Sequence, residues 1–148
     1  MLQNLRSRAQ SEEGFTLIEL LVVILIIGIL AAIALPTFLG QRAKAQDSAA
    51  KSDARNMVSE VESCYTDTQT YATCDTIADL GTTTGLALVN GTPAASSGTV
   101  GVASSSVDGY VITAASKSGN SFTITKTAGG AVVKSCTGTT GGCNSLTW

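Results

Sequence analysis

The sequence predicts an α+β fold in which a long N-terminal hydrophobic α-helix packs against a small antiparallel β-sheet. Three observations lead to this prediction. The run Phe15–Leu35 is apolar on every side, and an amphipathic helical pattern continues it to about Tyr65. Residues 66–148 then alternate short β-rich stretches with turns rich in glycine and serine. The chain also has four cysteines, an even number that suggests two disulfides. We therefore expect a helix over residues 15–65 and a globular β-sheet domain over residues 66–148.

The first half of the expected helix is the apolar run Phe15–Leu35. A helix of this length is about 31 Å long, close to the hydrocarbon thickness of a bilayer. Because the run has no polar face, it fits a membrane or an assembly of similar helices. Glu19 is its single ionisable residue, and a carboxylate inside hydrocarbon costs about 2.5–3.5 kcal/mol. Two interpretations stay open at this point: Glu19 snorkels to the headgroups, or it pairs with a positive group of another copy of the chain.

The second half of the expected helix, residues 36–65, begins at a proline. Pro36 lacks the backbone donor of a continuing helix, so it marks either a helix end or a kink. We favour the kink, because a helical pattern resumes at once. Five residues form an apolar stripe at helical spacing: Ala50, Ala54, Met57, Val61 and Cys64. Charged residues are assigned to the other, solvated faces: Asp47, Lys51, Asp53, Arg55, Glu60 and Glu62.

The residues that open the apolar run carry a resemblance. Gly14-Phe15-Thr16-Leu17-Ile18-Glu19, followed by the run itself, resembles the processing site of type IV prepilins and the related pseudopilins. The resemblance implies that residues 1–14 are a leader, removed by a prepilin peptidase that cuts between Gly14 and Phe15. It also implies N-methylation of the new Phe15 amine. Glu19 would then pair with that amine on a neighbouring subunit during assembly.

By this resemblance the chain would be the structural subunit of a type IV pilus, serving adhesion, motility or DNA uptake. Residues 15–35 would anchor a single-pass precursor in the inner membrane and later form the core of an extracellular homo-oligomeric filament. The partners implied are the prepilin peptidase and the pilus assembly machinery. The positive-inside rule would place the C-terminal domain in the cytoplasm, because Arg42, Lys44, Lys51 and Arg55 follow the run. We place the C-terminal domain outside nonetheless, since paired cysteines form in oxidising compartments.

Two alternative functions remain. One is a pseudopilin or minor pilin of a type II secretion or competence filament. Main-shaft pseudopilins of type II secretion carry an acidic calcium site near the C-terminus, whereas here no Asp or Glu follows Asp108. That difference favours a pilin. The other alternative, from a different class, is a membrane-anchored extracellular binding domain that never polymerises.

The β-sheet domain is expected to be closed by local disulfides. Four cysteines allow three pairings, and proximity favours Cys64–Cys74, which leaves Cys136–Cys143. Residues 75–81 are typical of a single helical turn with a glycine stop. The clearest strands are 110–114 and 121–125, joined by a turn at 117–120, with a further strand at 131–133. Weaker candidates are 86–89 and 100–102. We expect a three- or four-stranded antiparallel meander that covers the apolar stripe of the helix.

The composition argues against catalysis. The chain has no histidine, its net charge is −2, and its cysteines are expected to be paired. We therefore expect no enzyme, no cofactor and no metal; the spacing of Asp67, Asp75 and Asp79 matches no calcium loop. Three lysines have no opposing acid nearby in the sequence: Lys117, Lys126 and Lys134. The simpler interpretation is a solvated face, and the alternative is that these lysines bind DNA phosphates. Trp148 either packs against the Cys136–Cys143 loop or forms an exposed contact.

Overall fold

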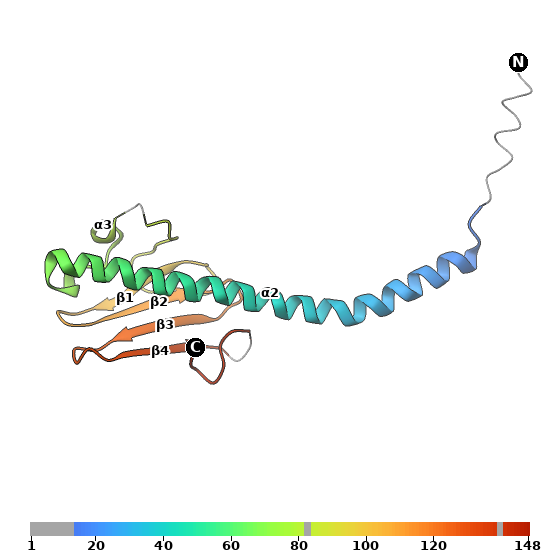
Figure 1. The fold of residues 1–148 in the computed structure, drawn as a ribbon. Helices are drawn as coiled ribbons and strands as arrows, with labels where there is room; N and C mark the ends of the chain where they lie inside the picture. The colour runs from blue at the N-terminus through green and yellow to red at the C-terminus, as the bar shows by residue number, and fades with distance from the viewer. Residues whose placement is uncertain (1–13, 82–83, 139–140) are drawn as a thin grey trace, which may run out of the picture. The chain divides into compact units, whose positions relative to one another are not determined.

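The computed structural model describes residues 14–81, 84–138 and 141–148 (Figure 1). Its helices are α2 (Leu17–Thr68), the short 3-10 helix η1 (Tyr71–Thr73) and the single turn α3 (Ile77–Leu80). Its strands are β1 (Val100–Ser105), β2 (Tyr110–Ala115), β3 (Ser121–Lys126) and β4 (Val132–Thr137). The predicted α+β class, with a long apolar helix, an antiparallel sheet and two disulfides, is confirmed. The chain divides into two compact units between Phe38 and Leu39, which are described separately below.

Helix α2 continues through Pro36 rather than ending there. The proline deprives the carbonyl of Ala32 of its usual donor four residues later, but the flanking residues keep helical hydrogen bonding. The helix ends at Thr68, three residues beyond the expected Tyr65. Gln69 follows with a positive φ of 57° and donates its backbone N–H to the carbonyl of Tyr65 at 2.8 Å. This left-handed residue terminates the helix.

The core of the second unit forms where α2 lies across one face of the sheet (Figure 1). The helix contributes the predicted stripe: Ala50, Ala54, Met57 and Val61 are all at most 4% exposed. Alternate residues of the strands meet it, namely Val100, Val102, Ile112, Ala114, Phe122 and Ile124. Burying a side chain such as Met57 or Phe122 contributes about 1.5–3 kcal/mol each.

The sheet is an antiparallel meander with strand order β1-β2-β3-β4. The turn between β2 and β3 is closed by the backbone N–H of Ser116, which donates to the carbonyl of Asn120 at 2.8 Å. Gly119 adopts φ 101° in this turn, a conformation that favours glycine. The expected strand at 86–89 is wrong: only Leu88 forms an isolated bridge, to Val100. The segment is apolar throughout and does not alternate with polar residues, and Gly85 and Gly91 flank it.

Both disulfides join cysteines that are close in sequence. Cys64 is bonded to Cys74, which ties the end of α2 to η1. Cys136 of β4 is bonded to Cys143, which holds the C-terminal segment against the sheet. Between them, α3 is a single turn with a capping box, in which Thr76 accepts from the Asp79 backbone and Asp79 accepts from Thr76. Gly81 ends it with φ 83°.

Candidate functional site

The start of α2 is organised by Thr16 and Glu19. The backbone carbonyl of Thr16 accepts the first helical hydrogen bond, from Leu20 at 3.3 Å, so Thr16 is the N-cap. Its hydroxyl accepts from the Glu19 backbone N–H at 3.2 Å, and the Glu19 carboxylate accepts from the Thr16 backbone N–H at 3.0 Å. The Thr16 hydroxyl also donates to the same carboxylate oxygen at 2.9 Å. The two residues therefore form a capping box, a signal that Thr-x-x-Glu carried in the sequence and that our sequence analysis missed.

Only one of the two Glu19 carboxylate oxygens takes part in this cap. Both Thr16 contacts go to Oε2, and within the described residues Oε1 makes no hydrogen bond. Glu19 is exposed, as is Phe15, whose side chain is 86% exposed. Gly14 precedes the helix and is exposed as well. The arrangement leaves one carboxylate oxygen, about one turn from Phe15, ready to accept from a donor outside the chain.

The apolar surface beyond Glu19 is large and has no partner within the described residues. Every large hydrophobic residue from Leu17 to Leu39 is exposed, with exposed fractions from 44% for Val22 to 81% for Leu17. Helix α2 contains a stretch with a mean hydropathy of 3.1, long and apolar enough to cross a membrane. Contiguous exposed apolar surface of this extent marks a membrane or protein–protein contact. The first unit is thus a segment that needs an apolar environment.

The second unit contains a buried polar cluster that our sequence analysis placed wrongly in solvent. Asp47 has no exposed surface. Its carboxylate accepts from the hydroxyl of Ser118, from Asn120 Nδ2 at 2.9 Å and from the backbone N–H of Gly142 at 2.6 Å. Burial alone would raise the pKa of Asp47, but these hydrogen bonds outweigh it and hold the pKa below its usual value. The cluster joins α2, the β2–β3 turn and the C-terminal loop, so its role is structural.

A second polar cluster corrects the expectation that Lys126 has no opposing acid. Lys126 forms an ion pair with Glu62 of α2 at 2.7 Å and donates to the Tyr71 hydroxyl at 2.5 Å. Glu62 also accepts from Tyr71 at 2.8 Å and from Tyr110 at 3.0 Å. Hydrogen bonding to Glu62 raises the pKa of Lys126. The acid comes from the helix, 64 residues earlier, which a local search of the sequence could not reveal.

Trp148 packs against the sheet. Its indole N–H donates to the carbonyl of Ser135 at 2.8 Å, and its ring forms a T-shaped pair with that of Phe122, with centroids 5.7 Å apart. Of the other residues considered for ligand binding, Asp75 accepts from Ser105 at 3.1 Å and Asp79 caps α3. These contacts assign both carboxylates a structural role. Within the described residues, no group of three or more His, Cys, Asp or Glu side chains is arranged to hold a metal ion.

Comparison with known proteins supports the importance of the N-terminal segment. Residues 10–35 match the prokaryotic N-terminal methylation motif. The chain is 40% identical over 93 residues to fimbrial protein EcpC of Eikenella corrodens, covering 63% of this chain and 61% of that protein. It is 43% identical over 63 residues to the type IV major fimbrial protein FimA of Dichelobacter nodosus, covering 43% and 40% of the two chains. It is also 38% identical over 68 residues to the type II secretion system core protein G of Klebsiella michiganensis, covering 46% and 48%.

These matches span about two fifths to three fifths of the relatives' own length. No solved structure matches the chain. The matched methylation motif, residues 10–35, includes the features described above: the Gly14-Phe15 junction, the capping box with Glu19, and most of the exposed apolar helix. By this segment, the chain carries the prokaryotic N-terminal methylation motif and is a relative of the type IV fimbrial proteins and the type II secretion core proteins.

Proposed function

We propose that this chain is the structural subunit of a type IV pilus. Cleavage between Gly14 and Phe15 by a prepilin peptidase, followed by methylation of the Phe15 amine, yields the mature subunit. Residues 15–35 hold it in the inner membrane and then form the core of an extracellular filament. The chain is a building element and not an enzyme. Residues 1–14 are the leader, α2 (Leu17–Thr68) is the helix, and the residues that follow it make up the outer domain.

One observation carries the proposal. The exposed apolar surface from Leu17 to Leu39 coexists with a second unit that already buries its own core stripe. In a soluble monomer this surface would stay in water, at a cost of about 25 cal/mol for each Å² of apolar surface. A bilayer removes the cost before assembly, and neighbouring copies of the same helix remove it afterwards. The unused Oε1 of Glu19 is the acceptor for the cationic Phe15 amine of a neighbouring subunit.

A pseudopilin or minor pilin is the second candidate, and a specific observation supports it: the similarity to a type II secretion core protein covers 46% of this chain. Pilins and pseudopilins share the N-terminal segment, so the two differ in where the filament is found. Abundant filaments that shear from the cell surface indicate a pilin. A processed chain confined to the membrane fraction indicates a pseudopilin.

The role of Glu19 is tested by substitution in the producing cell. Glu19→Gln keeps an oxygen that can accept from Thr16 but removes the charge, and Glu19→Ala removes both. Both variants are expected to insert into the membrane and to be cleaved, while the yield of sheared filaments falls by about tenfold or more because the Phe15 amine loses its ion partner. Asp67→Ala, which removes an exposed carboxylate at the other end of α2, is the control. Unchanged filament yield in both Glu19 variants would contradict the proposed role and favour a membrane-anchored binding domain.

A further inference from the structure

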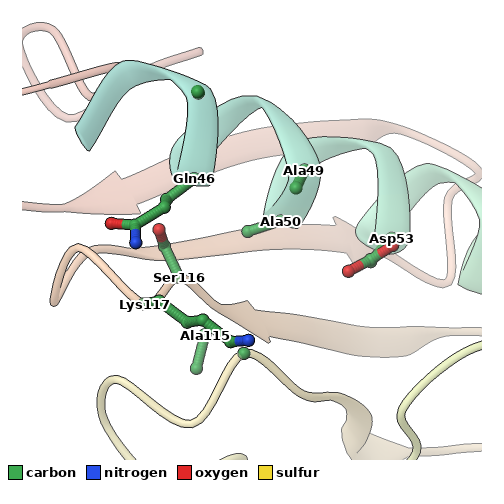
Figure 2. Close-up of a pocket in the computed structure, with 9 residues that line it drawn as sticks. Gln46, Ala49, Ala50, Asp53, Ala115, Ser116 and Lys117 are labelled. Atoms are coloured by element: carbon green, nitrogen blue, oxygen red, sulfur yellow. The ribbon is translucent and has the colours of Figure 1, made fainter. Parts of the chain in front are cut away.

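A pocket lies on one flank of α2, entirely within the second unit (Figure 2). Its volume is about 490 Å³, and its lining includes four small apolar side chains, Ala45, Ala49, Ala50 and Ala115. Asp53 stands on the helix wall, and Lys117, from the turn between β2 and β3, stands on the opposite wall (Figure 2). The pocket lining therefore combines small apolar side chains with one acidic and one basic side chain.

Asp53 has no partner for its charge among the residues that the structure describes. It is half-buried, accepts no hydrogen bond there and forms no ion pair with Lys117 across the pocket. Burial without compensation raises the pKa of Asp53. Glu60 lies seven residues further along α2, two helical turns away on the same flank, and is likewise unpaired within the described part of the chain. This flank thus presents two carboxylates that gain from an approaching cation.

A basic cluster lies on the other flank of α2, around Trp148. The Arg55 guanidinium and the Lys134 ammonium each lie 5.1 Å from the centre of the Trp148 ring, and the Lys51 ammonium lies 5.8 Å from it. Lys51 donates to the carbonyl of Gly142 at 2.6 Å. Arg55 and Lys134 are exposed and, within the described residues, have no carboxylate partner. The cluster thus carries three positive charges, and an anion that approaches it is attracted by all three.

The two flanks point in opposite directions. Asp53 and Arg55 are two residues apart on one helix, which separates their side chains by about 200° around the helix axis. A single copy therefore cannot bring the two together, but a neighbouring copy can. Contact between two different flanks is a heterologous interface, and repetition of such an interface builds an open helical filament.

We propose that the Asp53 pocket of one subunit receives the basic cluster of the next, with Arg55 and Lys134 pairing with Asp53 and Glu60. This inference rests on the proposed function, because it names contacts between neighbouring subunits of that filament. The alanines that line the pocket accommodate the aliphatic parts of the incoming arginine and lysine. The charge pairs set the register of the outer domains, independently of the apolar helices at the core.

Cross-linking in filaments tests the pairing. Cells co-expressing Asp53→Cys and Arg55→Cys chains assemble mixed filaments, which are sheared and treated with a short bismaleimide. The expected result is a cross-linked dimer in mixed filaments and none in filaments made from either variant alone. Ser52→Cys, on the solvent face of α2, replaces Asp53→Cys in the matched control and gives no dimer with Arg55→Cys. Peptide mapping identifies the joined positions.

Charge reversal provides the second measurement. Asp53→Arg and Arg55→Glu are each expected to lower the yield of sheared filaments by about tenfold, and combining them in one chain restores it, since each flank again meets its opposite charge. Mixed filaments that form normally but give no cross-link between the Asp53→Cys and Arg55→Cys chains would overturn this inference and leave the proposed function standing. Unchanged yield with Arg55→Glu, joined with loss of binding to immobilised DNA, would assign the basic cluster to a polyanion instead. If the unsubstituted chain forms no filaments, the proposed function fails and the inference fails with it.

Discussion

Asp47 shows how a single residue can be misplaced when only its chemical type is considered. A carboxylate on a surface helix is normally solvated, yet here it lies three residues before Ala50, on the same face as the core stripe. At that point of the helix the sheet ends, and the β2–β3 turn and the C-terminal loop provide donors in place of apolar side chains. Ser118, Asn120 and the backbone of Gly142 supply the hydrogen bonds. Asp47 therefore fastens three segments that share no regular hydrogen bonding.

Asp47→Ala is expected to destabilise the folded second unit by about 3 kcal/mol, because it leaves buried donors without an acceptor. Thermal or denaturant unfolding of the full chain in detergent measures the loss. Ser48→Ala, one residue along on the exposed surface, is the control and should change the free energy of unfolding by less than about 0.5 kcal/mol. Equal effects of the two substitutions would show that the Asp47 contacts contribute nothing to stability.

The pH dependence of stability follows from the same carboxylate. The pKa of Asp47 is lowered on folding, so the folded state holds its proton less tightly than the unfolded state, whose value is about 3.9. The stabilisation is complete well above that unfolded value and is lost as the pH falls through the lower, folded pKa. Asp47→Asn should therefore flatten the acid side of a stability–pH profile. A variant profile parallel to that of the unsubstituted chain would contradict this assignment.

The environment of some residues could be predicted from the sequence, and that of others could not. The apolar stripe could be predicted because its members are spaced along one helix face. The stripe also held the signal for Asp47, since the 3–4 spacing extends back to it. Glu62 and Lys126 carried no such signal, because their pairing depends on how β3 is placed against α2. Long-range polar pairs of this kind follow from the tertiary structure alone.

At the scale of elements, the N-terminus of α2 depends on Thr16 as much as on Glu19. Thr16 positions the carboxylate by two contacts to Oε2 and leaves Oε1 exposed. Thr16→Ala removes the hydroxyl, and with it about 1 kcal/mol of capping energy. Filament yield is expected to fall in Thr16→Ala but to stay near normal in Thr16→Ser, which retains the hydroxyl. A loss in both variants would point to the threonine methyl group and away from the cap.

Removal of each disulfide is expected to lower the free energy of unfolding by a different amount. Loop closure alone predicts similar contributions of about 2–3 kcal/mol, with slightly more for the longer Cys64–Cys74 loop. The Cys136–Cys143 bridge additionally holds Gly142 where its N–H reaches Asp47. Replacing Cys136 and Cys143 by alanine should therefore destabilise more than replacing Cys64 and Cys74, as measured by denaturant unfolding. The reverse order would mean that loop closure alone accounts for both bridges.

The helices and strands that depend on interactions local in the sequence were predicted best. The long helix and the β2–β3 hairpin rest on local periodicity and turn residues, and both were predicted close to their observed bounds. The candidate strand at 86–89 had weak alternation, and it contributes only the Leu88 bridge to β1. The predicted cleavage junction between Gly14 and Phe15 came from a resemblance to a known family and not from a physical pattern alone. The capping box is present in the sequence as Thr-x-x-Glu. It was missed because Glu19 lies in an apolar run and was therefore interpreted only as a charge.

The whole molecule combines one unit that buries its own apolar core with another that exposes its apolar surface. The unit 39–148 buries its own core and is fastened by two disulfides and two polar clusters. The described part of the other unit exposes an apolar helix that only a bilayer or other subunits can cover. This combination is what the proposed function requires, since a membrane-anchored precursor then becomes a subunit of a filament.

The intact mass of the chain in the material sheared from whole cells tests this account most directly. We expect a mass that begins at N-methylated Phe15 and lacks four hydrogens, one pair for each disulfide, in abundant filaments. The same processed mass found only in membranes would move the assignment to a pseudopilin or minor subunit. An uncut chain beginning at Met1 would contradict the account, because Gly14, Phe15 and Glu19 would then have no part in processing or assembly.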